Sequence, residues 1–417
     1  MSRREKRTTR RRVLQGLAAA SLFGWKAGDA ARRPARALSA RTAGVDVAII
    51  GAGVFGAWTA WHLARKGLSV VLVDAHGPAN ARASSGGENR VLRVAYGTAR
   101  HYARWALESL RPWRELSERQ SAPLFFPTGV LWLARERDAY IDDSLKTLAE
   151  LGVRHEILDP SQLAQRWPQI SLDGVGIGFL EHDGGGILAR RAVQAVVREA
   201  QAAGASLRIA AARAPEPQAA GVRVPLGDDG EIIAERVVYA CGPWLPKLFP
   251  GLIGNRILPT RQEVYFFGAA AGDRRFLPRQ LPVWADFNEG DIFYGLPDLE
   301  GRGFKVAHHA FGEPIDPETA DRRISPAGVR EVRAFLRRRF PALAEAPLIG
   351  ARVCQYSVRM NEDFLIDRHP HDPRVWLVGG GSGHGFKHGP ALGSYLARLV
   401  AGEEKSPIPG RFRLSNG

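Results

Sequence analysis

A glycine-rich turn that follows an apolar run constrains the fold of this 417-residue chain more than any other feature. Residues 45–50 form the apolar run, which is typical of a buried parallel strand. The residues from 54 to 65 have a helical pattern, and Gly67 ends it. Between them lies the spacing G-x-G-x-x-G, supplied by Gly51, Gly53 and Gly56. The order strand, glycine turn, helix predicts the start of a βαβ nucleotide-binding unit.

Each glycine of this motif has a physical role in such a unit. Gly51 permits the tight turn, Gly53 lets the backbone approach a pyrophosphate, and Gly56 lets the helix pack closely on the strand. The pyrophosphate would lie against free N–H groups at the helix N-terminus. Asp74 closes a second strand over 69–73 and is placed to accept hydrogen bonds from ribose hydroxyls. These residues predict a bound adenine dinucleotide, either FAD or NAD.

A second glycine-dense turn near the C-terminus favours FAD. Residues 375–378 read as a strand, and a helix begins at Pro390. Between them, Gly383 and Gly385 let backbone lie against a flat ligand beside Phe386. The helix N-terminus can stabilise negative charge on a reduced isoalloxazine ring. A nicotinamide enzyme has no obvious need for this second turn.

The middle of the chain changes character. Short β-type runs separated by turn residues predict an antiparallel sheet; they cover 129–134, 263–267, 291–295 and 304–308. A helix at 189–202 and a strand ending at 242 return to the α/β pattern. We therefore predict an α/β fold in which a Rossmann-type FAD-binding domain carries an inserted antiparallel-sheet α+β substrate domain. The predicted segments are 44–122, 184–256 and 349–402 for the FAD domain, 123–183 and 257–348 for the substrate domain, and 403–417 for a C-terminal tail.

The net charge of +15 is concentrated in a leader at residues 1–43, which holds twelve Lys and Arg side chains against two acidic ones. Nucleic-acid binding therefore loses its main support. The stretch TRRRVLQ at 9–15 fits a twin-arginine export signal, and a mildly apolar run over 13–25 follows. We expect the folded protein to meet the twin-arginine export machinery and to work in the periplasm; the alternative is a disordered basic tail. The basic run at 337–339 is predicted to be a solvated helix face.

Further motifs occur in one order along the chain: SSGGENRVLR at 84–93, ACGPW at 240–244, FKVAHH at 304–309, VCQY at 353–356 and GHGFK at 383–387. With these motifs the chain from residue 44 onward resembles the sarcosine oxidase branch of the D-amino-acid-oxidase-like flavoproteins. The resemblance implies a two-domain fold with FAD extended between the domains. Where that branch carries a histidine just before its arginine pair, this chain has Gly86 and Gly87.

The resemblance assigns a carboxylate-binding pair. Arg90 takes the place of the flavin-proximal arginine, and Arg93 takes the place of the arginine that grips the substrate carboxylate, with Lys387 as its partner. Charge-assisted hydrogen bonds of this kind contribute about 1.5–3 kcal/mol each. The structural alternatives are a domain-interface salt bridge for Arg93 and a surface lysine for Lys387.

The resemblance also places residues around the flavin ring. Lys305 aligns with a lysine that activates oxygen, although an edge-strand lysine is the alternative. His309 aligns with an active-site histidine, and a core histidine is nearly as good a reading. Cys354 aligns with a cysteine that is linked covalently to the flavin; the alternatives are a buried free thiol or a disulfide with Cys241. Tyr294 and Tyr356 are expected to be pocket walls.

The sequence therefore predicts FAD-dependent oxidation of the C–N bond of a small secondary or N-methyl amino acid to an imine, with electrons passed to oxygen. No metal site is expected. One alternative keeps the fold but passes electrons to a quinone or a cytochrome at the membrane. A second is a non-catalytic flavin-binding protein, and an NAD(P)-dependent reductase is the weakest.

Overall fold

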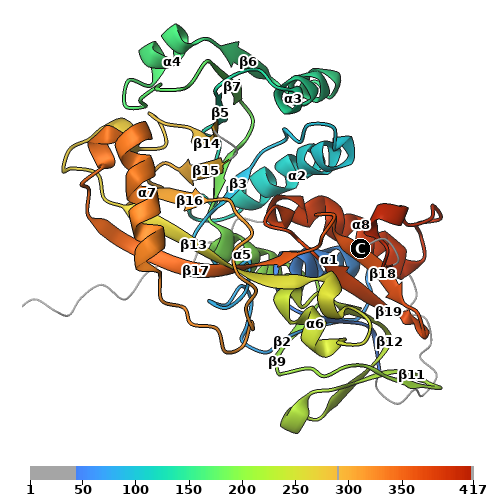
Figure 1. The fold of residues 1–417 in the computed structure, drawn as a ribbon. Coiled ribbons are helices and arrows are strands. Elements are labelled where there is room, and N and C mark those ends of the chain that lie inside the picture. The colour runs from blue at the N-terminus through green and yellow to red at the C-terminus, as the bar shows by residue number, and fades with distance from the viewer. Residues whose placement is uncertain (1–43, 289–290, 415–417) are drawn as a thin grey trace, which may run out of the picture. The chain divides into compact units, whose positions relative to one another are not determined.

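The apolar run after the leader forms β1, which pairs in parallel with β12 on one side and β2 on the other. The computed structural model describes residues 44–288 and 291–414, so the predicted export signal in the leader lies outside the described residues. The sheet follows the order β10-β11-β12-β1-β2-β9, with β19 beside β12 and β18 beside β19 (Figure 1). Its strands are β1 (Val45–Ile50), β2 (Val70–Asp74), β9 (Ser206–Ile209), β10 (Glu216–Gln218), β11 (Gly221–Pro225), β12 (Glu231–Tyr239), β18 (Leu365–His369) and β19 (Asp372–Gly379).

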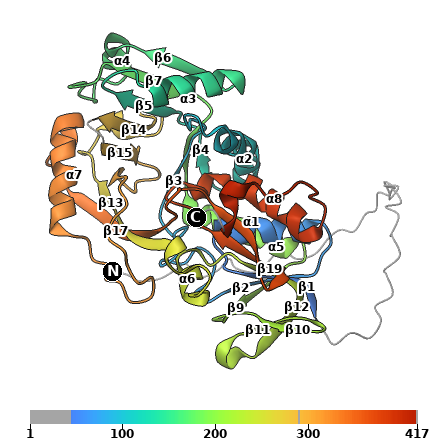
Figure 2. The same ribbon diagram turned by 45° about the vertical axis from the view of Figure 1, so that its right-hand side comes forward.

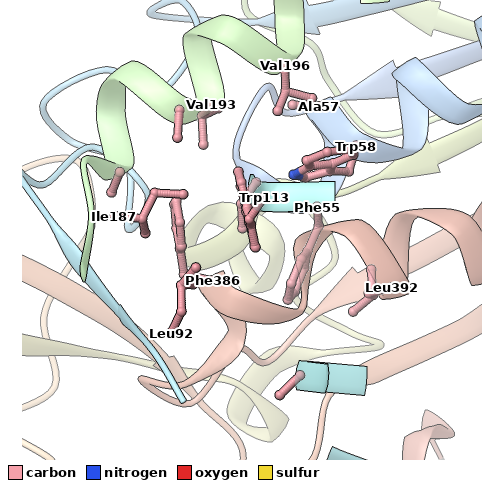
Figure 3. Packing of buried hydrophobic residues seen from close by; sticks show 14 of the residues in the cluster. Phe55, Ala57, Trp58, Leu92, Trp113, Ile187, Val193, Val196, Phe386 and Leu392 are labelled. Carbon is pink, nitrogen blue, oxygen red and sulfur yellow. The ribbon is translucent and has the colours of Figure 1, made fainter. Parts of the chain in front are cut away.

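Helix α1 packs against both α5 and α8 beside this sheet, and α2 lies next to α8 (Figure 2). Their bounds are α1 (Val54–Arg65), α2 (Arg100–Glu118), α5 (Ala189–Ala202) and α8 (Gly389–Ala401); the short α6 (Leu245–Leu248) follows β12. In the core that they enclose, Trp58 meets Trp113 edge-on, and Trp113 stacks on Phe386 with 5.3 Å between ring centroids (Figure 3). Aromatic pairs contribute about 0.5–1.5 kcal/mol beyond their burial. This packing anchors the second glycine-dense turn.

The second sheet follows the order β17-β13-β16-β15-β14-β5-β7-β6. Its strands are β5 (Val130–Ala134), β6 (His155–Leu158), β7 (Ile177–Glu181), β13 (Leu258–Phe267), β14 (Val283–Asn288), β15 (Asp291–Leu296), β16 (Phe304–His308) and β17 (Leu348–Val358). Helix α7 (Pro326–Arg339) lies along it (Figure 1), while α3 (Ala139–Glu150) and α4 (Pro160–Arg166) adjoin its other end. The prediction of a purely antiparallel sheet is wrong at one place, because β14 pairs with β5 in parallel. These two strands come from separate segments of the chain, so no hairpin imposes an antiparallel pairing.

A small sheet in the order β3-β8-β4 carries the start of the predicted carboxylate-binding pair. Its strands are β3 (Arg90–Leu92), β4 (Phe125–Phe126) and β8 (Gly185–Ile187). The pairing of Arg90 with Ile187 fixes the backbone at the first arginine. Arg93 follows immediately after the strand.

One segment predicted for the FAD domain contains a strand of the second sheet. The sequence assigned 349–402 to the FAD domain, but β17 pairs with β13 of the second sheet along most of its length. Its far end also accepts a hydrogen bond from the second glycine-dense turn, through Ser357 O and Ser382 N at 3.0 Å. The strand therefore serves both parts, and residues 43–417 group as one compact unit. The division into two domains stays a prediction.

The predicted tail and the predicted solvated face also differ from expectation. Phe412 is 2% exposed and packs on Trp105, so this residue of the predicted tail is held against the core. Arg339, at the end of the basic run, is wholly buried. Among the described residues, no helix is both long enough and apolar enough to cross a membrane.

Candidate active site

The first glycine turn opens into a cavity of about 510 Å³. Gly51 has φ +107°, and a Cβ there would stand 2.4 Å from Ala240 O. A Cβ at Gly56 would stand 1.9 Å from Gly51 O, so α1 approaches the turn as closely as backbone allows. Gly53 lines the cavity, and a Cβ there would meet only Ser85 Oγ at 3.5 Å. Gly51 and Gly56 therefore allow close backbone approaches that a side chain would prevent, and the contact of Gly53 with a pyrophosphate stays a prediction.

Two side chains organise the same turn. Asp74 Oδ2 accepts from Ala52 N at 2.9 Å, and its Oδ1 accepts from His76 N at 2.9 Å. Burial raises the pKa of Asp74, although these backbone hydrogen bonds oppose the rise. Ser85 Oγ accepts from Val54 N at 3.1 Å, so a residue from a distant loop satisfies an N–H at the start of α1. Gly53, Val54 and Phe55 at this end of α1 line the cavity.

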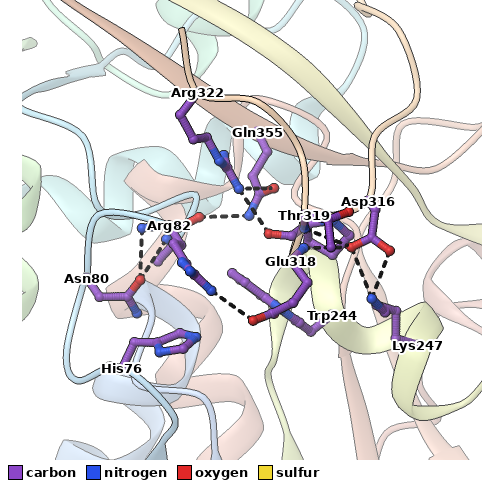
Figure 4. Close-up of polar contacts among 12 residues, drawn as sticks. His76, Asn80, Arg82, Trp244, Lys247, Asp316, Glu318, Thr319, Arg322 and Gln355 are labelled. Atoms are coloured by element: carbon purple, nitrogen blue, oxygen red, sulfur yellow. Dashed lines mark hydrogen bonds and ion pairs between the residues drawn. The ribbon is translucent and has the colours of Figure 1, made fainter.

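A segment at 312–322 crosses from the second sheet to this cavity, and we call it the clasp. Glu318 lines the cavity; it accepts from Trp244 Nε1 at 2.7 Å and from Arg82 at 2.8 Å (Figure 4). Asp316 accepts from Lys247 Nζ at 2.8 Å. Arg322 donates to Gln355 Oε1 at 3.2 Å. The clasp thus ties the nucleotide-binding loops to β17.

A second cavity of about 570 Å³ adjoins the first. The two share part of their walls, formed by Arg90, Tyr356, Gly383 and Phe386. The second cavity is largely aromatic, with Tyr96, Tyr102, Trp132, Tyr140, Phe287 and Tyr294 in its wall. A flat ligand that extends from the first cavity would meet a second molecule at the shared wall.

The structure brings Arg93 and Lys387 together in the second cavity. The Arg93 guanidinium lies 4.1 Å and the Lys387 ammonium 5.2 Å from the centre of the Tyr96 ring. Lys387 Nζ donates to Tyr96 Oη and to His384 O, both at 2.8 Å. Burial lowers the pKa of Lys387 well below its ordinary value, and the positive charge of Arg93 adds to the effect. The surface-lysine alternative is wrong for Lys387, which is 5% exposed, and Arg93 lines the same cavity.

A buried carboxylate that the sequence reasoning missed lies behind this pair. Glu181 is fully buried at the end of β7. It accepts from Val94 N at 2.6 Å, from Ala95 N at 3.2 Å and from Trp132 Nε1 at 2.8 Å. Burial raises the pKa of Glu181, and the hydrogen bonds together with Arg93 oppose the rise. One buried carboxyl group therefore faces two basic side chains, the half-buried Arg93 and the buried Lys387.

His309 lies in the same cavity wall, at the end of β16. Its Nδ1 is 3.3 Å from Tyr356 Oη. Burial lowers the pKa of His309 to about 4, and Arg93 and Lys387 contribute. The imidazole is therefore neutral at pH 7. Tyr294 and Tyr356 form cavity walls as predicted, whereas the neighbouring His308 turns to α7 and pairs with Glu331 at 2.9 Å.

Lys305 and Cys354 lie beside the cavities and form no part of either wall. Lys305 is 1% exposed; its Nζ is 3.4 Å from Asn89 O and 5.1 Å from the centre of the Tyr294 ring. Burial lowers the pKa of Lys305 to about 7, and the charge of Arg90 adds to this. Cys354 is a buried free thiol, packed with Val264 and Phe266. Cys241 is also free, so the two form no disulfide.

Arg90 connects the two groups of predicted residues. It lines both cavities, and it is electrostatically coupled to Lys305. Its guanidinium donates to Asn89 O at 2.7 Å. A Cβ at Gly87 would stand 2.5 Å from Arg90 Nη1, so the glycine found in place of the family histidine makes room for this arginine.

The sequence reasoning also missed Tyr96, Tyr102 and Arg411. Tyr96 is three residues beyond Arg93, and this closeness in the sequence could have indicated that it belongs to the same site. Arg411 reaches the second cavity from the C-terminal segment and pairs with Asp363 at 3.0 Å. Nothing in the sequence marked that long-range contact. Among the residues described, no cluster of His, Cys, Asp and Glu side chains is suited to a metal ion.

Comparison with known proteins decides the family. The profile of the family described as FAD dependent oxidoreductase matches residues 46–399. This chain belongs to that family. It is an FAD-dependent oxidoreductase, and the glycine turn, Asp74 and the capped helix fit the nucleotide part of FAD.

Two relatives can be aligned with most of this chain. It is 30% identical to the monomeric sarcosine oxidase of Bacillus sp. (strain B-0618) over 364 residues, which are 85% of this chain and 92% of the relative. It is 31% identical to the N-methyl-L-tryptophan oxidase of Escherichia coli O127:H6 over 377 residues, 89% and 98% of the two chains. A solved structure of NikD, an unusual amino acid oxidase, superposes with a TM-score of 0.73 at 25% identity and covers 89% of this chain and 98% of that one. The mixed α/β fold predicted from the sequence is confirmed.

Proposed function

We propose that this flavoprotein oxidises the C–N bond of a small secondary or N-methyl amino acid to an imine and passes the electrons to oxygen. The observation that carries the proposal is the pair of basic side chains, the half-buried Arg93 and the buried Lys387, in the wall of an aromatic cavity. That cavity shares a wall with the one shaped for FAD. The sarcosine and N-methyl-L-tryptophan oxidases among the relatives support the same substrate class.

Arg93 and Lys387 would hold the substrate carboxylate. Lys387 uses two of its three N–H groups on Tyr96 Oη and His384 O, so one remains for a ligand. Glu181 balances one of the two positive charges, and a bound carboxylate would balance the other. Because Lys387 is buried and Arg93 half-buried, these charge-assisted bonds are stronger than they would be in water.

His309 would face the amine. Its imidazole is neutral at pH 7, so it can hydrogen-bond to an amine without adding a third positive charge. Tyr356 Oη lies 3.3 Å away and restrains the ring. A neutral amine, with its lone pair free, is the form from which a hydride leaves.

FAD, when bound, accepts the hydride from carbon and supplies the electrons that reduce oxygen. Arg90, Gly383 and Phe386 at the shared wall would lie against it, together with Gly51, Gly53 and Asp74 at its nucleotide end. Lys305 would stabilise negative charge as it develops on oxygen, which is a preorganised electrostatic effect. Cys354 would be the point of a covalent link, since cationic side chains surround it.

We further propose that the leader exports the folded flavoprotein through the twin-arginine machinery to the periplasm. The support is the TRRRVLQ stretch and the concentration of positive charge in residues 1–43. In that compartment a quinone or a cytochrome would compete with oxygen as the electron acceptor. Stopped-flow reoxidation by air tests oxygen as the acceptor, because an oxidase reoxidises fast and a dehydrogenase slowly.

The substrate proposal is tested by screening amines for bleaching of the flavin absorbance. We expect N-methyl amino acids to bleach it and their decarboxylated counterparts to do so poorly. Lys387→Ala should raise KM for the amino acid far more than it lowers flavin content, by about 10- to 100-fold for one charge-assisted bond. A protein that no amine bleaches would be a non-catalytic flavin-binding protein. An unchanged KM would remove Lys387 from the carboxylate site.

A further inference from the structure

The hydroxyl of Tyr96 lies at the centre of a buried group of nitrogen atoms. His388 Nε2 is 2.7 Å away, Lys387 Nζ is 2.8 Å away and His384 Nδ1 is 3.1 Å away. The three nitrogens belong to the second glycine-dense turn, in η6 (Gly385–His388) and the residue before it. Tyr96 comes from the loop that follows Arg93. The contact therefore joins two segments almost 300 residues apart in the chain.

Hydrogen-bond accounting fixes the direction of each bond. His384 Nε2 lies 3.1 Å from Glu362 O, which can only accept, so this nitrogen carries a proton. A neutral imidazole has one N–H, so His384 Nδ1 accepts, and Tyr96 gives it the single hydroxyl proton. In its protonated form Lys387 can only donate. His388 Nε2 must then donate to Tyr96 Oη as well.

Both histidines are neutral in this arrangement. Burial lowers the pKa of His384 and of His388 well below the ordinary value, and the charge of Lys387 acts in the same direction. His388 is fully buried, and its Nδ1 has no hydrogen-bond partner among the described residues. That unpaired atom is the cost of turning the Nε2–H toward Tyr96. The tyrosine oxygen then accepts two hydrogen bonds and donates one, which is its full capacity.

The ring of the same tyrosine sets the position of the other cation. Arg93 lies over its face at 4.1 Å from the centroid. The hydroxyl and the ring face of one side chain thus contact both members of the predicted carboxylate-binding pair. Cation–π contacts are strongest where the cation is desolvated, as it is here.

We propose that Tyr96 is the positioning residue of the Arg93–Lys387 pair, and that His384 and His388 orient its hydroxyl so that Lys387 keeps one N–H for the substrate carboxylate. This inference rests on the proposed function, because it presupposes a substrate that carries a carboxylate. Tyr96 acts through the two cations and takes no part in the transfer of electrons.

The test compares Tyr96→Phe with the unchanged protein on two substrates, the best N-methyl amino acid and its decarboxylated amine. Tyr96→Phe should raise KM for the amino acid about 10-fold or more and leave kcat and the KM for the amine within about threefold, because one bond to a charged group is lost. Acetate, titrated through the change in visible absorbance of the flavin, should bind more weakly by a similar factor. Tyr239→Phe is the matched control: it also removes a buried tyrosine hydrogen bond, to Arg213 O at 2.7 Å, but contacts neither cation.

The outcomes separate this inference from the function on which it rests. If the unchanged protein does not distinguish the amino acid from the amine, the proposed function fails. If it distinguishes them and Tyr96→Phe binds acetate equally well, only the positioning role is overturned.

His388→Leu and His388→Gln provide a second test of the hydrogen bond to Tyr96, since glutamine keeps an N–H donor. The glutamine variant should retain most of the acetate affinity that the leucine variant loses, and equal losses would show that packing and not the hydrogen bond matters.

Discussion

The guanidinium of Arg339 lies 2.6 Å from Oδ2 of Asp286, and both side chains are 1% exposed. The pair joins the end of α7 to β14 of the second sheet. Arg339 also donates to the backbone oxygens of Ser171 and Asp173. The interaction therefore joins α7, β14 and the segment at 171–173.

Removing one partner of this pair should be costly. Arg339→Ala removes the guanidinium that faces the buried carboxylate of Asp286, and we expect a loss of about 3–5 kcal/mol in the free energy of unfolding. Urea unfolding followed by circular dichroism measures it. Arg337→Ala is the control, because that residue is exposed and pairs only with Glu345 at 3.3 Å, so it should change stability by less than about 1 kcal/mol. Equal effects of the two variants would contradict the assignment.

The burial of Arg339 was readable in the sequence, although the prediction missed it. The buried residues of α7 are Val332, Phe335, Leu336 and Arg339, at the i, i+3, i+4 and i+7 positions of one helix face. The prediction of a solvated face relied on the charge of the basic run and gave less weight to the helical spacing of the apolar residues. The limits of the strand and helix around the first glycine turn were predicted closely. The apolar run, the glycines and the helical spacing of apolar residues all indicate the same boundaries there.

The sequence could not supply the contacts that join distant segments. The parallel pairing of β5 with β14, the approach of the clasp to Trp244 and the cap that Ser85 gives to α1 each link residues far apart in the chain. Motif order placed Arg93 and Lys387 in one site, and the structure brings them together. It gave no sign of Glu181, whose role depends on the end of β7 meeting the loop after β3.

Lys305 should make stability depend on pH in a defined direction. Burial lowers its pKa to about 7 in the folded state, whereas lysine in an unfolded chain titrates near ~10.4. Between these values the unfolded chain binds more protons at this position, so stability rises with pH across that window. Below pH 7 the lysine is protonated in both states, and the cost of burying its charge is present in full.

Lys305→Met should therefore stabilise the protein at pH 7, and its advantage should shrink as pH approaches 10. Melting temperatures of the variant and the unchanged protein, compared at both pH values and at matched flavin content, measure this. Lys146→Met serves as the control, since Lys146 is exposed on α3. A constant difference between Lys305→Met and the unchanged protein from pH 7 to pH 10 would contradict a lowered pKa.

The clasp should slow the release of FAD. Glu318 holds Trp244 and Arg82 across the mouth of the first cavity. In a Cys354→Ser background, which removes any covalent link, Glu318→Ala should speed FAD dissociation about three- to tenfold, the factor expected for modest, half-exposed hydrogen bonds. The rise of flavin fluorescence after dilution reports the rate. Asp321→Ala is the control: Asp321 lies close by in sequence, and its carboxylate pairs with Arg323, two residues away.

The two free cysteines should behave differently toward the flavin. Cys354 lies among cations, since Lys305, Arg322 and Arg352 are all coupled to it. Cys241 has Asp74 nearby, and burial raises its pKa, so its thiol remains protonated. A thiolate is the nucleophile in such links, so Cys241 is poorly suited to attack an electron-poor ring. Acid precipitation should leave the yellow colour with the unchanged protein and with Cys241→Ala, and release it from Cys354→Ala. Colour that stays with the chain in Cys354→Ala would move the link elsewhere, and colour released from the unchanged protein would show that FAD is held without a covalent bond.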